Sequence, residues 1–446
     1  MPPARFTYPF CYVPCPEIRA AADRLISELD RLNSGGSELP GGISARAAAE
    51  LSQGKMMGVL WTDRGFLYAF SGLIGGRATV TGFVPPIFDY SDPEGYFRRR
   101  EAEISAVAAD SGEGRRMRAG MSAELQDWLF RQYVVMNGRG EQASILDIFS
   151  MRGLVPPGGT GECAAPKLLN HAFREGMKPL AMGEFWYGRA PLREVRSQGC
   201  FYPSCTGKCG PLLSWMMKGL DVAPNPLDEG FSDGTEPQII YEDESIIVVD
   251  KPAGMLSVPG RVKAPSLLEW LRERFGEVHS CHRLDMDTSG LMVFARNAEA
   301  KTALELQFAG REVSKTYRAR LVAAPANSGR NMKKGAKGTI ALPLMTDWDD
   351  RPRQMVDKVN GKKAITEYEV TEVLPDGEVE VLFTPLTGRT HQLRVHAAHK
   401  EGLGRPIKGD RLYGDSTGGR LWLHAVTLTF RHPSGGGTVT FSSVRP

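Results

Sequence analysis

Two positively charged side chains and two carboxylates stand close together past the middle of the chain. His282 and Arg283 are followed within four residues by Asp285 and Asp287, and an apolar run occupies residues 291–295. The apolar run predicts a buried strand, and the Ser-Gly pair before it predicts that the charged residues lie on a loop leading into that strand. Such a loop could hold a catalytic carboxylate kept ionised by neighbouring cations, or a structural ion pair at the entrance of a strand. These residues alone leave both alternatives open.

Four stretches of sequence, taken in order, resemble one known family. The His-Arg-Leu-Asp run at 282–285, with Thr-Ser-Gly-Leu at 288–291, resembles the central motif of the RluA family of pseudouridine synthases. Three further segments resemble the family's first motif, its tyrosine-containing strand and its last motif, namely residues 239–261, 313–321 and 386–414. The resemblance covers residues 237–446, and the conserved order of the segments makes it far more specific than any one of them.

The resemblance implies an enzyme that isomerises uridine in RNA, with three catalytic residues. Asp285 matches the family's catalytic aspartate, Arg394 its ion-pair partner, and Tyr317 a tyrosine that stacks on the base and accepts a proton. We expect Asp285 rather than Asp287 to act, with Asp287, two residues further along, pointing away from the site. We also expect Arg394 to lower the pKa of Asp285 by placing a positive charge beside it.

Four more residues are expected to bind the substrate. By the resemblance, Arg283 is placed to enter the RNA where the target base leaves its stack, and His282 supports the loop. Arg389 and His391 belong to a basic segment that could face phosphates, and a helix is predicted from about His391 with Thr390 as its cap. No cofactor and no small-molecule partner are expected, because the isomerisation exchanges neither electrons nor phosphates.

The expected partner is a stem-loop of rRNA, tRNA or both. Residues 343–354 resemble the corresponding stretch of the RluA subfamily proper, whose members act on such loops. The alternative is a non-catalytic RNA-binding or ribosome-assembly factor that keeps the fold. The presence of Asp285, Tyr317 and Arg394 together favours the enzyme.

The expected fold class is α+β, with two domains. Residues 237–446 should adopt the pseudouridine-synthase fold, a mixed, mainly antiparallel bent sheet with flanking helices. The acidic, Pro- and Gly-rich residues 221–236 are predicted to be a linker, and residues 1–220 a separate, Cys-containing α+β domain of unknown function. The linker motivates the further prediction that residues 237–446 fold and catalyse alone.

Charge and hydropathy place few limits on the function. The net charge of the 446 residues is +3, but residues 237–446 carry 30 Lys and Arg against 25 Asp and Glu, while the remainder is slightly acidic. The carboxy-terminal half is therefore the better candidate for meeting phosphates. No run approaches the ~18 apolar residues that a membrane helix needs, and no apolar signal segment begins the sequence. A cytoplasmic, monomeric protein is expected.

The amino-terminal half gives local predictions but no recognised function. A helix is predicted from Pro16 to about residue 32, an antiparallel meander of strands at 58–61, 66–70 and 78–81, and charged helices within 96–135. Cys163, Cys200, Cys205 and Cys209 could be buried thiols or metal ligands, since their spacing fits only loose zinc patterns. We expect no metal site but leave this alternative open.

Overall fold

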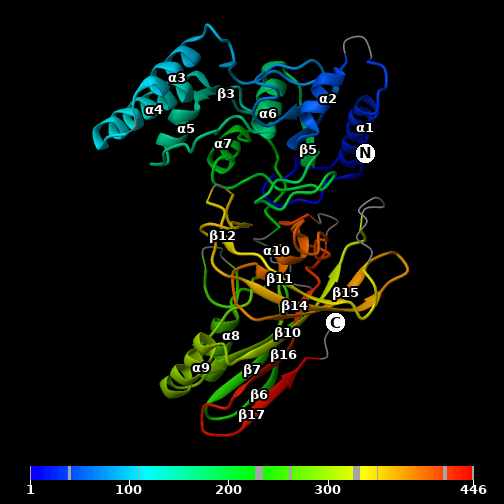
Figure 1. Cartoon of the computed structure of the whole chain (residues 1–446), viewed down its shortest axis with the longest axis vertical. Coiled ribbons are helices and arrows are strands. Elements are labelled where there is room, and N and C mark those ends of the chain that lie inside the picture. Colours follow the sequence, from blue (N-terminus) through cyan, green and yellow to red (C-terminus); the bar gives the residue numbers. More distant parts are fainter. Residues whose placement is uncertain are drawn as a thin grey trace. The chain divides into compact units, whose positions relative to one another are not determined.

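The computed structural model describes residues 2–38, 42–108, 110–226, 235–260, 264–324, 332–348, 350–414 and 419–443, and the chain forms two compact units (Figure 1). The amino-terminal unit comprises Met1–Ala190, Ser197–Ala223 and Trp348–Arg351. The carboxy-terminal unit comprises Pro191–Arg196, Pro224–Asp347 and Pro352–Pro446. A short piece from each half of the sequence therefore belongs to the unit that is built mainly from the other half.

Helices cover both faces of a small sheet in the amino-terminal unit. Its elements are α1 (Pro16–Asn33), α2 (Ala45–Leu51), β1 (Lys55–Thr62), β2 (Gly65–Phe70), α3 (Tyr96–Ala106), α4 (Gly112–Gln132), β3 (Val134–Met136), β4 (Gln142–Ser144), α5 (Ile145–Ser150), α6 (Ala164–Arg174), β5 (Pro179–Tyr187) and α7 (Cys209–Met216). Strands β2, β1 and β5 pair antiparallel in that order, with α6 packed on one face and α1 and α2 on the other. Gly58 in β1 permits this packing, because a Cβ there would lie 2.8 Å from side-chain atoms of Ala164 and Leu168.

The predicted amino-terminal helix and the charged helices α3 and α4 are confirmed, but the predicted meander is wrong in its third strand. Residues 78–81 form no strand. The third strand of the sheet is β5, more than one hundred residues after β1 in the chain, and it pairs with β1. Strand β5 has nine residues, seven of them buried, so it covers far more apolar surface than a four-residue strand could.

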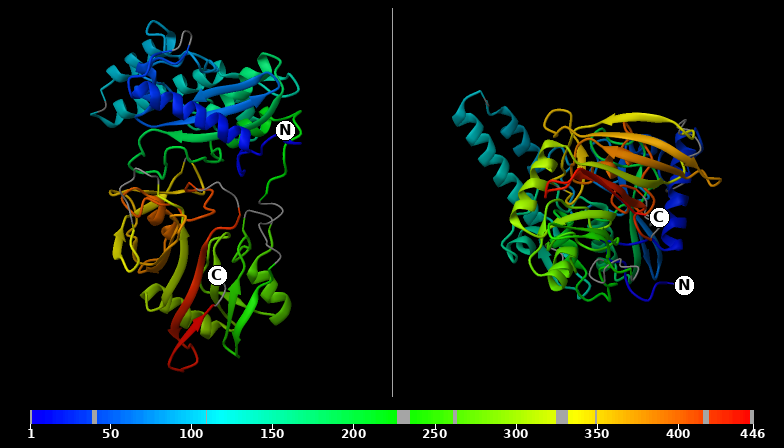
Figure 2. Two further views of the ribbon diagram at one scale, coloured as in Figure 1. Left: turned by 90° about the vertical axis from the view of Figure 1, so that its right-hand side faces the viewer. Right: turned by 90° about the horizontal axis from the view of Figure 1, so that it is seen from below.

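A ten-stranded sheet forms the centre of the carboxy-terminal unit. The elements of this unit are β6 (Gln238–Glu242), β7 (Ile246–Lys251), α8 (Leu267–Phe275), β8 (His279–Ser280), β9 (Ser289–Ala295), α9 (Ala298–Gly310), β10 (Ser314–Leu321), β11 (Lys337–Ala341), β12 (Leu344–Thr346), β13 (Gln354–Val356), β14 (Ile365–Val373), β15 (Val379–Pro385), α10 (Gln392–Ala398), β16 (Leu423–Arg431) and β17 (Thr438–Ser442). The order in the sheet is β11-β14-β15-β10-β16-β9-β7-β6, with β17 beside β16 and β8 beside β9. The long strand β16 runs through its middle (red in Figure 2). The predicted α+β class with a mixed, mainly antiparallel sheet is confirmed.

The junction between β9 and β16 fixes where the polar loop ahead of β9 enters the sheet. These two strands pair parallel, whereas the other strand pairs among the described residues are antiparallel. Gly290 stands at the junction with φ 115°, and a Cβ there would lie 2.4 Å from the backbone of Ala425. A glycine is therefore required where the two strands meet.

Strand β11, at Lys337–Ala341, pairs with β14 at the end of the sheet, and residues 325–331 ahead of it lie outside the described residues. Residues 227–234 of the predicted linker also lie outside them, and the predicted domain boundaries stay a prediction. Val195, from the short piece Pro191–Arg196, is only 3% exposed in the core of this unit.

Candidate active site

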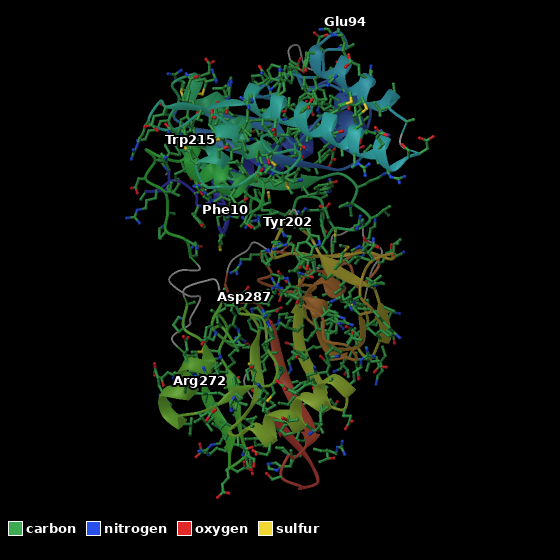
Figure 3. The ribbon with its side chains drawn as sticks, turned by 90° about the vertical axis from the view of Figure 1, so that its left-hand side faces the viewer. Phe10, Glu94, Tyr202, Trp215, Arg272 and Asp287 are labelled. Carbon is green, nitrogen blue, oxygen red and sulfur yellow. The ribbon has the colours of Figure 1, made fainter. Side chains whose placement is uncertain are left out.

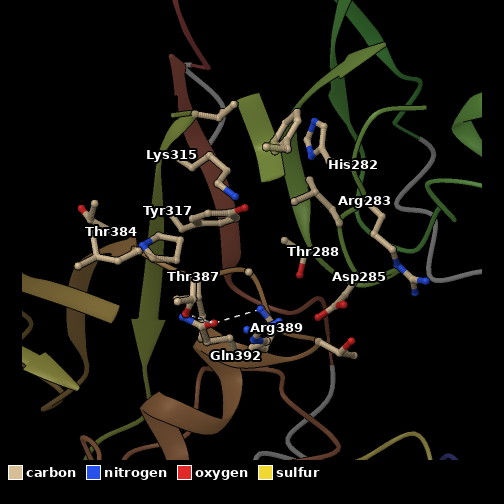
Figure 4. A pocket seen from close by; sticks show the side chains of 18 of the residues that line it. His282, Arg283, Asp285, Thr288, Lys315, Tyr317, Thr384, Thr387, Arg389 and Gln392 are labelled. Atoms are coloured by element: carbon tan, nitrogen blue, oxygen red, sulfur yellow. Dashed lines mark hydrogen bonds between the residues drawn. The ribbon is translucent and has the colours of Figure 1, made fainter. Parts of the chain in front are cut away.

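A cleft of about 970 Å³ opens on the carboxy-terminal unit (Figure 4). Most of its walls come from three segments that are far apart in the sequence, namely the polar loop ahead of β9, the stretch from the end of α9 into β10, and the stretch from the end of β15 into α10. The structure brings to this cleft all seven residues named from the sequence, which are His282, Arg283, Asp285, Tyr317, Arg389, His391 and Arg394. Folding of the sheet is what gathers them, because no two of the three segments adjoin along the chain.

The two carboxylates of the polar loop are separated by a turn. The backbone N–H of Thr288 donates to the carbonyl of Asp285 over 3.1 Å, which closes this turn. Asp285 lines the cleft, whereas Asp287 (labelled in Figure 3) pairs with Arg411 at 3.0 Å. The two side chains thus have different surroundings, and the cause is the turn, because residues two apart in an extended segment would point to the same face.

Buried donors from the first motif hold the polar loop in place. Lys251 is fully buried at the end of β7 and donates to the carbonyls of Pro252, Met255 and Met286. The Ser257 hydroxyl both accepts from the backbone N–H of Leu284 and donates to its carbonyl. Sequence reasoning gave these two residues no role, although both stand within the segment that resembles the first motif.

Arg394 has a closer partner than the one predicted. Its guanidinium is 2% exposed and forms a bidentate pair with Asp410, with Nε and Nη2 at 2.8 and 2.7 Å from the two carboxylate oxygens. Its third nitrogen, Nη1, lies 3.9 Å from Oδ2 of Asp285. Asp410 was missed from the sequence, and its presence in the last matched segment was the only signal. The arginine is therefore oriented by one carboxylate and presented to another.

The pKa of Asp285 is raised, opposite to the predicted direction. Burial is the main cause, and the positive charges of Arg394 and Arg283 offset only part of it. Arg394 does lower the pKa of Asp285, as predicted, but this effect is smaller than the increase caused by burial. No described residue donates a hydrogen bond within normal length to this carboxylate, which is 21% exposed. A carboxylate in this state is a stronger base than one in water.

Tyr317 lies across the cleft on β10, paired with Phe383 of β15 on one side and Ala425 of β16 on the other. Its side chain is 9% exposed and lines the cleft. Burial, together with the negative charge of Asp285, raises the pKa of its hydroxyl, so the phenol is neutral. A neutral phenol beside a carboxylate can stack on a base and exchange a proton.

The predicted substrate-binding residues occupy different depths of the cleft. His282 accepts a hydrogen bond from the backbone N–H of Val293 and stacks on Phe308, and burial lowers its pKa to about 3. It is therefore a neutral side chain that ties the polar loop to β9. Arg283 is exposed at the rim, where it could reach RNA (Figure 4). Arg389, in contrast, donates from Nε to the carbonyl of Lys363.

His391 stands at the entry to α10 in an unusual backbone conformation. The helix begins at Gln392, and His391 precedes it with φ 52°, so the prediction that Thr390 caps this helix is wrong. A non-glycine residue in the left-handed region is uncommon and is held there by its surroundings. The imidazole is 9% exposed and points its Nε2 toward Asp285, 3.9 Å from Oδ2.

Comparison with known proteins gives the same family as the motifs. Residues 245–399 match the family described as RNA pseudouridylate synthase. The chain is 43% identical over 221 residues to the dual-specificity RNA pseudouridine synthase RluA of Salmonella typhimurium, covering 48% of this chain and 96% of that protein. The RluA of Escherichia coli strain K12 is 42% identical over 223 residues, 48% of this chain and 97% of its own length. Human RNA pseudouridylate synthase domain containing 1 is 28% identical, with a TM-score of 0.39 over 50% of this chain and 87% of that one.

The mainly antiparallel sheet of this unit carries a cleft that presents a carboxylate, an arginine and a tyrosine. Together with the matched family, this places the chain in the class of RNA pseudouridine synthases. Within this class the chain belongs to the RluA family, since it covers nearly the whole length of relatives that share over 40% of their residues with it. The sequence-based recognition and the assignment as an enzyme are both confirmed.

The described part of the chain offers no support for the alternative that its cysteines bind a metal. In that part no group of three or more His, Cys, Asp or Glu side chains is arranged to hold a metal ion, and none of the seven cysteines forms a disulfide. No helix among the described residues is long and apolar enough to cross a membrane. The predicted monomeric state stays a prediction.

Proposed function

We propose that this enzyme converts uridine to pseudouridine in stem-loops of rRNA, tRNA or both, with Asp285 as the catalytic carboxylate. The observation that carries the proposal is the placement of Asp285 in the cleft, 3.9 Å from Arg394 and opposite Tyr317. Two similar proteins bear the name dual-specificity RNA pseudouridine synthase, which supports more than one RNA target. Single-stranded loops suit the reaction, because less base pairing is lost when a nucleotide is flipped out.

The proposed chemistry uses the chain's own side chains. Asp285 acts at the ribose as nucleophile or base, the bond between C1′ and N1 of uracil breaks, the base turns, and C5 bonds to C1′. Arg394 orients the carboxylate and keeps its charge in the buried site, where burial raises its pKa. Tyr317 stacks on the base and relays the proton that C5 must lose, accepting it while its own hydroxyl proton passes to the freed carboxylate of Asp285. N1 gains a proton from solvent in exchange, so that product and substrate have the same atoms. Arg283 fills the vacancy in the RNA stack.

The assignment of the carboxylate is tested with a matched pair of variants. RNA labelled with tritium at C5 of uridine releases tritium to water when the C5 proton is lost. Asp285→Asn removes the charge with little change of shape and should abolish release, whereas Asp287→Asn should keep most of the activity because Asp287 pairs with Arg411 outside the cleft. Wild-type rates in Asp285→Asn would remove this residue from catalysis.

The substrate class is tested in cells of the source organism. Pseudouridines are mapped in rRNA and tRNA from a deletion strain and from the same strain carrying either the wild-type gene or the Asp285→Asn gene. We expect the wild-type gene alone to restore positions lost on deletion, and these positions to lie in loops. No lost position in either RNA class would contradict the proposed targets while leaving the C5 release assay as an independent measure of activity.

A further inference from the structure

We propose that His391 is a positioning residue, held as the tautomer with its proton on Nε2, which directs that proton at the catalytic carboxylate of Asp285. This inference rests on the proposed role of Asp285 and goes beyond it by assigning a second donor to the same carboxylate oxygen. The donors and acceptors around one buried hydroxyl, that of Tyr413, select this tautomer.

A chain of two hydrogen bonds decides which imidazole nitrogen carries the proton. The backbone N–H of Gln354 can only donate, and it donates to the Tyr413 hydroxyl over 2.8 Å. The same hydroxyl lies 2.8 Å from Nδ1 of His391. Tyr413 is 1% exposed, so its own proton needs an acceptor within the protein. Nδ1 is the acceptor that the described residues offer, and accepting this proton leaves Nε2 as the protonated nitrogen.

The alternative tautomer leaves a buried proton without a partner. If Nδ1 carried the proton, the Tyr413 oxygen would accept from both His391 and Gln354, and the phenolic O–H would have no described acceptor. A buried polar group left unpaired is costly, so the hydrogen-bond chain favours the Nε2–H form. Burial and the neighbouring charge of Arg394 also lower the pKa of His391 well below its usual range, which keeps the ring neutral with one proton.

The geometry directs this proton at the catalytic site. Nε2 of His391 and Nη1 of Arg394 each lie 3.9 Å from the same oxygen, Oδ2 of Asp285. Both donors are about 1 Å beyond hydrogen-bond length, so a small movement of the loop when RNA fills the cleft would engage them. The left-handed backbone at His391 and its bond to Tyr413 hold the ring at the required angle. The carboxylate would then be aligned by a neutral donor on one side and a cation on the other.

Two substitutions separate this role from a purely structural one. His391→Asn places an amide oxygen near Nδ1, keeps the bond to Tyr413 and tolerates the left-handed backbone, but loses the donor at Nε2. His391→Gln extends an amide nitrogen to the Nε2 position and loses the acceptor for Tyr413. We expect His391→Asn to lower the single-turnover rate at saturating RNA by roughly tenfold or more with nearly unchanged RNA affinity and melting temperature, since one preorganised donor is removed. His391→Gln should melt at a lower temperature yet react faster than His391→Asn.

The reverse order of rates would overturn the proposal, as would wild-type rates in both variants. A second measurement does not depend on activity. Nitrogen-15 NMR of protein labelled at histidine, with His391→Gln used to assign the signal, reports directly which ring nitrogen is protonated. We expect the Nε2–H form in wild type and a mixture of tautomers in Tyr413→Phe. An Nδ1–H signal in wild type would contradict the inference, whereas loss of the proposed RNA activity would leave this readout intact.

Discussion

Buried charges in the two units are satisfied in different ways. In the amino-terminal unit, Lys167 is 4% exposed and donates to the carbonyls of Phe70 and Gly72, and burial lowers its pKa to about 8. Glu184 is 4% exposed and accepts from the backbone N–H of Ala165, and burial raises its pKa to about 7. Both side chains therefore have hydrogen-bond partners within the amino-terminal unit.

In the carboxy-terminal unit Lys251 is likewise satisfied by backbone carbonyls, but Arg394 and Asp285 are arranged around a cleft. Arg394 is fixed by Asp410 on one side, yet its remaining nitrogen is presented to Asp285, whose carboxylate has no close hydrogen bond among the described residues. The difference shows that a perturbed pKa alone does not mark an active site. A catalytic group is distinguished by an incompletely satisfied atom that faces a space large enough for substrate.

The largest expected effect follows from breaking the Arg394–Asp410 pair. Asp410→Ala leaves a buried guanidinium without its bidentate partner, which should lower the free energy of unfolding by about 3–5 kcal/mol, as measured by urea denaturation. As a control, replacing both residues together, Arg394→Met with Asp410→Leu, should recover part of that stability but none of the tritium release. Recovery of activity in the double variant would mean that the pair serves the fold alone.

The next largest effect concerns the shape of the cation. Arg394→Lys keeps the charge but cannot contact Asp410 with two nitrogens while reaching toward Asp285 with a third. We expect the single-turnover rate at saturating RNA to fall by about a hundredfold, with affinity changed little. If Arg394 only touched a phosphate, affinity and its salt dependence would change instead and the saturating rate would stay normal.

A smaller effect is expected from removing the piece Pro191–Arg196 from the carboxy-terminal unit. A fragment of residues 237–446 keeps the whole cleft and should retain activity, but it lacks Val195, which contributes about 1.5–3 kcal/mol when fully buried. It also lacks the Arg193 partner of Asp357. Adding a peptide of residues 189–197 should raise the melting temperature of the fragment, and the same peptide with Val195→Asp should not. An inactive fragment would contradict the predicted independence of this domain.

The smallest effect is expected from Glu184 of the amino-terminal unit. Its folded-state pKa of about 7 lies above that of the unfolded chain, so the folded state binds more protons between these values and stability falls as pH rises through them. Glu184→Gln lacks this pH dependence. Relative to wild type, its free energy of unfolding should increase by about 1–2 kcal/mol between pH 5 and pH 8, with tritium release unchanged. Glu124→Gln, at a side chain that is 75% exposed, should show no such change.

The sequence by itself determined the family, the fold class and seven of the residues that line the cleft. The four ordered segments identified the RluA family, and helix α1 follows from its local periodicity and from the proline in its first turn. Residue types at fixed spacing sufficed for this helix, because a helix depends mainly on interactions between neighbours in the chain.

Only the tertiary structure decided which groups meet. The partner of β1 proved to be β5, because the pairing of distant strands depends on how much apolar surface each can bury and not on their separation along the chain. Asp410 became the partner of Arg394, and the net pKa of Asp285 rose, because burial in the folded cleft outweighs the nearby positive charges. The burial of Asp285 exists only after the strands have assembled around the cleft, so no local pattern in the sequence could predict it.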